Sequence, residues 1–283
     1  MQVSSNVRHQ KLQPVRLPQH TVDCCIYCGS FDLLTDEHVV PLGLGGDLIF
    51  PKSSCVACNE MTSRFELKVL RGHMTVARAV AGLPTRRKKG RPTSVSTKII
   101  RSDGSTAQVV IPLANAGALM LLPVLAPAAM IYGFDPVPNV QISGIDAINV
   151  GQDLSLFAVK HGADGIAGEV RLEHFTFCQV LCKIAYSYQV AMHGAFERNE
   201  SPALAILRGE ELNASNWVGT SMLPLNQQLT KSLHLIESRA RPSQHRETVQ
   251  VVTIQLFSNA GQSTFEVVVH AKNWRVWAKY ADA

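Results

Sequence analysis

The sequence predicts an α+β protein in two parts, an N-terminal module organised around cysteines and a longer domain with an antiparallel sheet. Two CxxC pairs lie within residues 21–60. A long helical pattern covers 173–193, and three segments of alternating apolar and polar residues close the chain at 233–236, 249–256 and 264–270. Strands and helices without a regular βαβ alternation are typical of the α+β class.

Composition sets limits on the protein without deciding its function. The chain has 283 residues and 46% hydrophobic residues, which is enough for a substantial core. A net charge of +5 is compatible with nucleic acid but is common in proteins that do not bind it. Residues 113–134 carry no charge, yet Pro123 and Pro127 interrupt them, so we expect no membrane span.

The chain divides into three regions by composition. Residues 1–20 are polar and predict a flexible tail. Residues 21–92 form the cysteine-bearing module and end in a basic linker, and residues 93–283 form the α+β domain. We expect helices at 59–70, with Asn59 as the cap, and at 74–81, 173–193 and 203–208, and strands at 94–101, 108–112 and 141–148.

Five of the seven cysteines lie within residues 24–58. This odd, clustered set predicts metal binding in a reducing cytoplasm rather than a disulfide framework, and the N-terminus lacks the apolar segment of a signal peptide. Two CxxC pairs at this separation are typical of a structural Zn²⁺ site with four thiolate ligands. The predicted zinc ligands are Cys25, Cys28, Cys55 and Cys58.

A second group of residues suggests catalysis. Glu37 and His38 are adjacent between the two cysteine pairs, and Asn59 directly follows the last cysteine. Oxygen atoms from Glu37 and Asn59 suit a hard divalent ion such as Mg²⁺ or Mn²⁺. A histidine side chain titrates near neutrality and suits the role of general base toward water. Together these residues are suited to phosphodiester hydrolysis.

At these residues the chain resembles the HNH, or ββα-metal, endonucleases of the His-Me finger group, in particular their four-cysteine branch. The resemblance rests on CxxC at 25–28, Glu37-His38-Val39-Val40-Pro41, Gly45-Gly46 and CxxC-Asn at 55–59. It covers about residues 22–70. It implies a zinc-stabilised, treble-clef-like ββα module, a structural zinc on the four cysteines, a catalytic metal on Glu37 and Asn59, and His38 as general base in DNA cleavage.

The sequence departs from the family pattern at two positions. Asn59 stands where many members have a histidine, and the asparagine that orients the base histidine is not evident. Asp47 or a backbone carbonyl could orient His38 instead. Asp36 is an alternative acidic ligand, and Glu37 is favoured because it directly precedes the histidine.

A basic run separates the module from the rest of the chain. Its Lys-Gly-Arg-Pro end, at residues 89–92, resembles the core of an AT-hook, while non-specific phosphate contact is the simpler interpretation. The predicted nucleic-acid contacts are Arg86, Arg87, Lys88, Lys89 and Arg91. His174, Cys178 and Cys182 share one helical face, and we interpret them as core and boundary residues rather than a second metal site.

Three functions are consistent with these observations. The first is a metal-dependent HNH endonuclease acting on DNA in the cytoplasm, for example in phage defence. The second is a zinc-dependent nucleic-acid-binding protein without catalysis. The third is a nuclease restrained by a C-terminal sensor domain. A homodimer, or a regulatory partner bound through residues 93–283, is compatible with all three.

Overall fold

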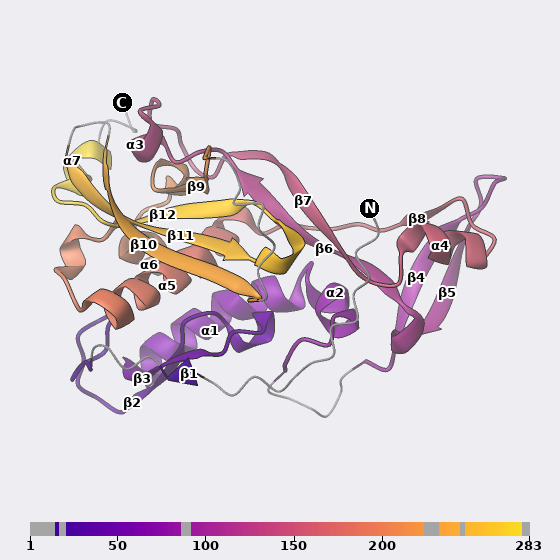
Figure 1. The fold of residues 1–283 in the computed structure, drawn as a ribbon, viewed down its shortest axis with the longest axis horizontal. Coiled ribbons are helices and arrows are strands. Elements are labelled where there is room, and N and C mark those ends of the chain that lie inside the picture. The colour runs from indigo at the N-terminus through magenta and orange to yellow at the C-terminus, as the bar shows by residue number, and fades with distance from the viewer. Residues whose placement is uncertain (1–14, 17–20, 86–91, 224–231, 244–246, 279–283) are drawn as a thin grey trace.

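A computed structural model of the chain describes residues 15–16, 21–85, 92–223, 232–243 and 247–278 (Figure 1). Helices and antiparallel sheets are mixed along the chain, which confirms the predicted α+β class. The described strands form four sheets with the orders β1-β3-β2, β10-β11-β12-β9, β5-β4-β8 and β6-β7. Both the basic run at 86–91 and most of the predicted N-terminal tail lie outside the described residues.

The N-terminal module is a hairpin followed at once by a helix. Strand β2 (Leu34–His38) pairs antiparallel with β3 (Leu48–Cys55), and β1 (Val15–Arg16) adds to β3 in parallel. Between the two longer strands, a 3-10 turn η1 (Leu42–Leu44) closes the hairpin. Helix α1 (Val56–Arg71) starts directly after β3, and α2 (Thr75–Val80) follows it.

The predicted cap of α1 was wrong by one turn. The helix begins at Val56, and Cys55, with an extended backbone (φ −71°, ψ 162°), is its N-cap. Asn59 therefore lies inside the first turn instead of before it. The strand runs into the helix without a connecting loop, so the last extended residue takes the cap position whatever its side chain.

Helix α5 (His174–His193) lies at the centre of the molecule. Apolar side chains surround it on nearly all sides, as its sequence predicts from Phe177 to Ala191. It ends at Gly194, the predicted C-cap. Helix α6 (Pro202–Arg208) packs beside it and ends at Gly209, whose φ of +74° is left-handed.

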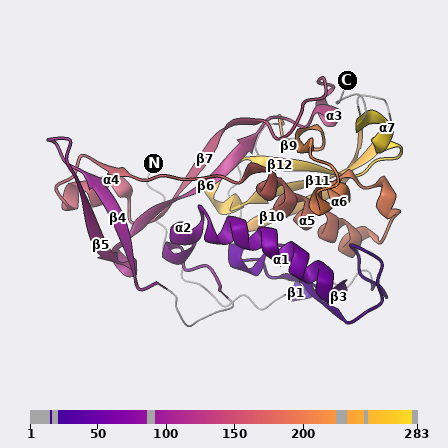
Figure 2. The ribbon, with the colours of Figure 1, turned by 180° about the vertical axis from the view of Figure 1, so that it is seen from behind.

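The largest sheet closes the C-terminal part of the chain. Its strands are β10 (His234–Pro242), β11 (Thr248–Leu256), β12 (Thr264–His270) and β9 (Val218–Thr220), all antiparallel. Figure 2 shows α5 and α6 on one face of this sheet, with α1 next to α5 on the other side of the helix. The three predicted closing strands are confirmed, and β10 is longer than expected.

The uncharged stretch at 113–134 is mostly a strand. Strand β6 (Gly117–Leu125) pairs with β7 (Ile142–Gly151), and a short helix α3 (Ala129–Tyr132) lies between them. Pro123 and Pro127 argued against a helix across this stretch, and Pro123 lies within β6. The strand was not predicted because apolar and polar residues do not alternate clearly here. Among the helices of the described ranges, none combines the length and apolar character needed to cross a membrane.

A smaller lobe lies at the far end of the β6–β7 hairpin (Figure 1). It contains β4 (Ser94–Ile100), β5 (Thr106–Pro112), β8 (Gly165–Ala167) and α4 (Leu154–Lys160) around its own small core. The remaining short elements are η2 (Leu113–Asn115), η3 (Arg198–Glu200), η4 (Ala214–Asn216), η5 (Ser258–Ala260) and α7 (Trp274–Ala278).

The larger core joins the two ends of the chain. One continuous cluster of buried apolar residues includes Phe50 and Phe65 of the module and Leu181 and Val252 of the C-terminal part. The smaller lobe begins with β4 at Ser94, shortly after the boundary predicted near residue 92. The module itself packs against α5, so the C-terminal part can influence any site that the module carries.

Candidate functional site

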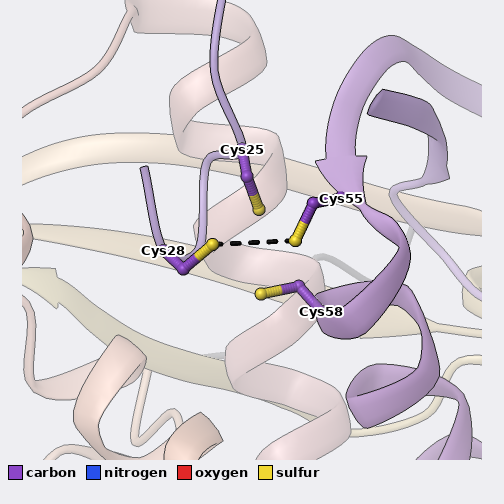
Figure 3. A group of neighbouring side chains, drawn as sticks. All are labelled: Cys25, Cys28, Cys55 and Cys58. Atoms are coloured by element: carbon purple, nitrogen blue, oxygen red, sulfur yellow. Dashed lines mark hydrogen bonds between the residues drawn. The ribbon is translucent and has the colours of Figure 1, made fainter. Parts of the chain in front are cut away.

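The four predicted zinc ligands converge on one point. The sulfur atoms of Cys25, Cys28, Cys55 and Cys58 all lie within 4.8 Å of one another (Figure 3). The Cys28 and Cys55 sulfurs are 3.6 Å apart, far too long for a disulfide bond. Sulfurs in a tetrahedral zinc site are separated by about 3.8 Å, given Zn–S bonds of ~2.3 Å. The cluster can therefore hold a metal ion such as zinc.

The chain folds tightly at the first cysteine pair. The amide of Cys25 donates to the Ser30 carbonyl at 2.7 Å, and the amide of Gly29 donates to the Cys25 carbonyl at 2.8 Å. Gly29 has a φ of +83°, which a side chain would oppose. The amide of Ile26 also donates to Ser53 in β3 at 2.9 Å, which ties this turn to the hairpin.

The second pair lies where β3 meets α1. Cys55 ends the strand and Cys58 falls in the first turn of the helix, so one metal would connect the strand, the helix and the turn at 25–28. Burial raises the pKa of Cys58, and Cys25 raises it further. Burial also acts to raise the pKa of Cys25, but backbone hydrogen bonds reverse the shift and the net change is downward. A bound cation would stabilise the thiolate form of all four sulfurs, which lie within 4.8 Å of one another.

Beside the sulfur cluster lies a buried acidic centre. The Oε1 atom of Glu37 is 2.6 Å from the Nζ atom of Lys183, and the Oε1 atom of Glu66 is 3.1 Å from the same nitrogen. The Lys183 side chain is 0% exposed and that of Glu37 is 4% exposed. Lys183 also donates to the backbone carbonyls of His38 and Val39. The acidic side chain predicted to bind a catalytic metal is thus paired with an ammonium group.

Electrostatics keep this lysine charged. Burial alone would lower the pKa of Lys183, but Glu37 and Glu66 outweigh burial and raise that pKa above its ordinary value. Burial raises the pKa of Glu37, and the nearby Lys183 opposes that rise without cancelling it. A buried ion pair of this kind is strongly coupled, because removing either partner leaves the other charge without compensation.

The catalytic divalent metal expected on Glu37 and Asn59 does not fit this arrangement. Glu37 points toward α5 and gives one carboxylate oxygen to Lys183. The amide of Asn59 donates to the hydroxyl of Thr35 at 3.4 Å. Glu66, and not Asn59, shares the Lys183 ammonium with Glu37 within the described ranges. Glu66 lies two turns along α1 from Asn59.

His38 lies on the other face of β2 from Glu37, because neighbouring side chains of a strand alternate. Asp36 falls where the register between β2 and β3 shifts. His38 is partly exposed and pairs with Ile49 in the hairpin register. Asp36 is exposed and accepts a hydrogen bond from the Lys52 amide at 3.1 Å. Asp47 is partly buried and directly precedes β3, one residue before the Leu48 carbonyl that accepts from the Val39 amide.

The C-terminal part holds the module through several more contacts, which the sequence did not reveal. The hydroxyl of Tyr186 in α5 donates to the Ile26 carbonyl at 3.0 Å. Arg198 donates to the carbonyls of Cys25 and Ile26, both at 3.2–3.3 Å, and Arg208 donates to that of Tyr27. The turn that carries the first cysteine pair is therefore fixed from two sides.

The sequence offered one signal for the acidic centre. Lys183 is the single charged residue between Phe177 and Ala191 on a helix that is otherwise apolar on nearly all sides. A lysine in such a position is buried only when paired. Its partners could not be named from sequence because 145 residues separate it from His38.

The other interpretations of single residues have simple outcomes. Cys178 and Cys182 are buried in the core, and the four cysteines at 25–58 are the group within the described ranges that could hold a metal. Arg64, Lys68 and Arg71 are exposed along one side of α1.

Comparison with family models, curated proteins and solved structures gives no match to the chain.

Proposed function

We propose that the protein is an HNH-type endonuclease that cleaves DNA, with Zn²⁺ on the four cysteines and His38 as general base. The observation that supports it most is the convergence of four sulfurs at the junction of β3 and α1. A metal at this point fixes a hairpin that carries Glu37 and His38 against the helix that carries Asn59. This combination is what the resemblance in the sequence implies.

Zinc in this site has a structural role. Four thiolates complete a tetrahedral shell, so the ion keeps no open position for water or phosphate. Its effect is on folding, because the ion would join the turn at 25–28, the end of β3 and the first turn of α1 at one point. Loss of zinc should therefore abolish any activity of the module indirectly.

The position of His38 supports a role as general base toward water. It ends β2, its side chain is partly exposed, and it lies on the sheet face opposite the buried Glu37. A neutral imidazole there can accept the proton of a water molecule as that water attacks phosphorus. A divalent cation such as Mg²⁺ or Mn²⁺ would assist the attack, and Glu37 could bind it only when separated from Lys183.

A surface suited to the DNA backbone lies on α1. Arg64, Lys68 and Arg71 are spaced four and three residues apart, so they form one exposed basic row. Phosphate contacts of this type are independent of sequence and weaken with salt. The basic run at 86–91 would add to them.

A second candidate is favoured by a specific observation. Because the carboxylate of Glu37 is buried against Lys183, the module could serve as a zinc-dependent DNA-binding unit without catalysis. This candidate predicts that DNA binding survives the loss of His38 and that added divalent metal has no effect.

The test is cleavage of supercoiled plasmid by zinc-loaded wild type, His38→Ala and the matched control His193→Ala, in which an exposed histidine is removed. Each protein is assayed with Mg²⁺, with Mn²⁺ and in buffer without divalent metal. The nuclease proposal expects nicking by wild type and the control and its loss in His38→Ala. If zinc-loaded wild type binds the plasmid without cutting it, the second candidate replaces the first. If His38→Ala cuts as well as wild type, His38 is not the general base.

A further inference from the structure

The acidic centre has the composition of a cation site. Four oxygen atoms surround the Lys183 nitrogen: one from Glu37 at 2.6 Å, one from Glu66 at 3.1 Å, the Val39 carbonyl at 3.3 Å and the His38 carbonyl. Two carboxylates with two backbone carbonyls are ligands that hard divalent ions commonly use in proteins. Here an ammonium group takes the central position.

The charge of this centre is incomplete. Two carboxyl groups face a single ammonium group, that of Lys183. The second oxygen of Glu37, Oε2, is buried and has no hydrogen-bond partner within the described parts of the chain. The buried hydroxyl of Tyr27 lies close to this carboxylate, because Tyr27 acts to lower the pKa of Glu37 and Glu37, after burial, raises the pKa of Tyr27. The Oε2 atom of Glu37 could therefore bind a cation with a higher charge than the Lys183 ammonium.

The ammonium comes from outside the module. Lys183 projects from α5, whereas all four oxygens belong to β2, the residue after it, and α1. Helix α5 is held against the module by the hydrogen bond from Tyr186 to Ile26, one turn from Lys183. A lysine on a central, fully packed helix does not leave its site by a simple change of side-chain rotamer.

We propose that the Lys183 ammonium is the resident cation of the Glu37–Glu66 centre and excludes a divalent ion from it while α5 is docked. Uptake of a divalent ion at Glu37 and docking of Lys183 are then mutually exclusive. The inference deepens the proposed function, because its meaning for DNA cleavage rests on that function. The occupancy of the centre itself can be tested without any cleavage.

The experiment measures Mn²⁺ binding to zinc-loaded protein by electron paramagnetic resonance and calorimetry. The variants are Lys183→Met, the same change combined with Glu37→Gln, and the matched control Lys160→Met, which removes an exposed lysine of α4. Lys183→Met is expected to gain a Mn²⁺ site at least about tenfold tighter than any in wild type. The gain should disappear in the double variant and be absent from the control.

Two results obtained with folded protein would overturn the proposal. The first is a Mn²⁺ site in wild type that Glu37→Gln abolishes, since the ion would then bind with Lys183 in place. The second is folded, zinc-loaded Lys183→Met that binds Mn²⁺ no better than wild type.

Folding of the variant gives a further readout. Lys183→Met leaves the buried carboxyl group of Glu37 and the partly buried one of Glu66 without their cation, which disfavours folding in metal-free buffer. Refolding with Mn²⁺ is then expected to restore near-native circular dichroism, and only when Glu37 is intact. Failure of Mn²⁺ to restore the fold of both Lys183→Met and the milder Lys183→Gln contradicts the proposal. Because no arm of the experiment uses DNA, an inactive nuclease leaves the result unaffected.

Discussion

His234 makes the stability of the protein sensitive to acid. It begins β10 and lies between the module and the large sheet. Its Nε2 atom is 3.0 Å from the Leu44 carbonyl, and its Nδ1 atom is 3.3 Å from the Phe257 amide. The amide must donate to Nδ1, so the ring is neutral with its proton on Nε2. A second proton would replace a hydrogen bond with repulsion.

The size of the effect follows from the pKa. Burial lowers the pKa of His234 from 6.5 to about 4, and the Leu44 carbonyl only partly opposes that change. The folded state therefore resists protonation more than the unfolded state does. The contribution of neutral His234 to the free energy of unfolding is present above the pKa of the unfolded state. It is lost as the pH falls through the pKa of the folded state. The full loss is about 3 kcal/mol, and about 2 kcal/mol of it falls between pH 7 and pH 5.

The assay is urea unfolding of wild type and His234→Gln at pH 7 and pH 5, followed by circular dichroism. Both proteins keep the four cysteines, so acid loss of metal affects them equally. The free energy of unfolding of wild type should fall by about 2 kcal/mol more than that of the variant over this interval. Equal losses in the two proteins would refute the assignment of the acid sensitivity to His234.

Three further predictions concern the metal, the acidic centre and the DNA surface. Cys58→Ser should lose its zinc and unfold, because structural zinc contributes about 10–16 kcal/mol of apparent binding free energy. The control Cys24→Ser should keep one zinc per chain by metal analysis. Equal zinc in the two variants would argue against the site. Lys183→Met should lower the free energy of unfolding in urea by about 3–5 kcal/mol, compared with under about 0.5 kcal/mol for the exposed Lys160→Met. Adding Glu37→Gln to Lys183→Met should recover part of that loss. If the effects of the two single changes simply add, the two charges are not coupled. Replacing Lys68 by Gln should weaken DNA binding and reduce the slope of log affinity against log salt by about 1, while the exposed Lys98→Gln on the small lobe should not; identical slopes would place the DNA elsewhere.

The metal cluster could be predicted because its information is local. Two short-range pairs fix the ligands, and the turn at Gly29 and the junction at Cys55 are both encoded within a few residues. Helix α5 was equally accessible, since its apolar pattern and the terminal Gly194 mark its length. Patterns of this kind do not depend on distant parts of the chain.

The acidic centre could not be predicted because it depends on tertiary packing. An acidic residue at position 37 suits both a metal ligand and an ion-pair partner. Only the docking of α5 decides that its carboxylate meets Lys183. The same packing determines that Glu66 of α1, rather than Asn59, shares that ammonium with Glu37. The cap of α1 and strand β6 were missed for a related reason, since neighbouring strands override weak local preferences.

The nuclease proposal is tested most directly by the pH dependence of plasmid nicking by zinc-loaded wild type between pH 5 and pH 8, in one buffer series and one divalent metal. If His38 acts as general base, the rate should fall about tenfold per pH unit once the imidazole is mostly protonated, and His38→Ala should show no such dependence. A rate that is flat across this interval, or nicking by His38→Ala with the same profile, would contradict the role of His38.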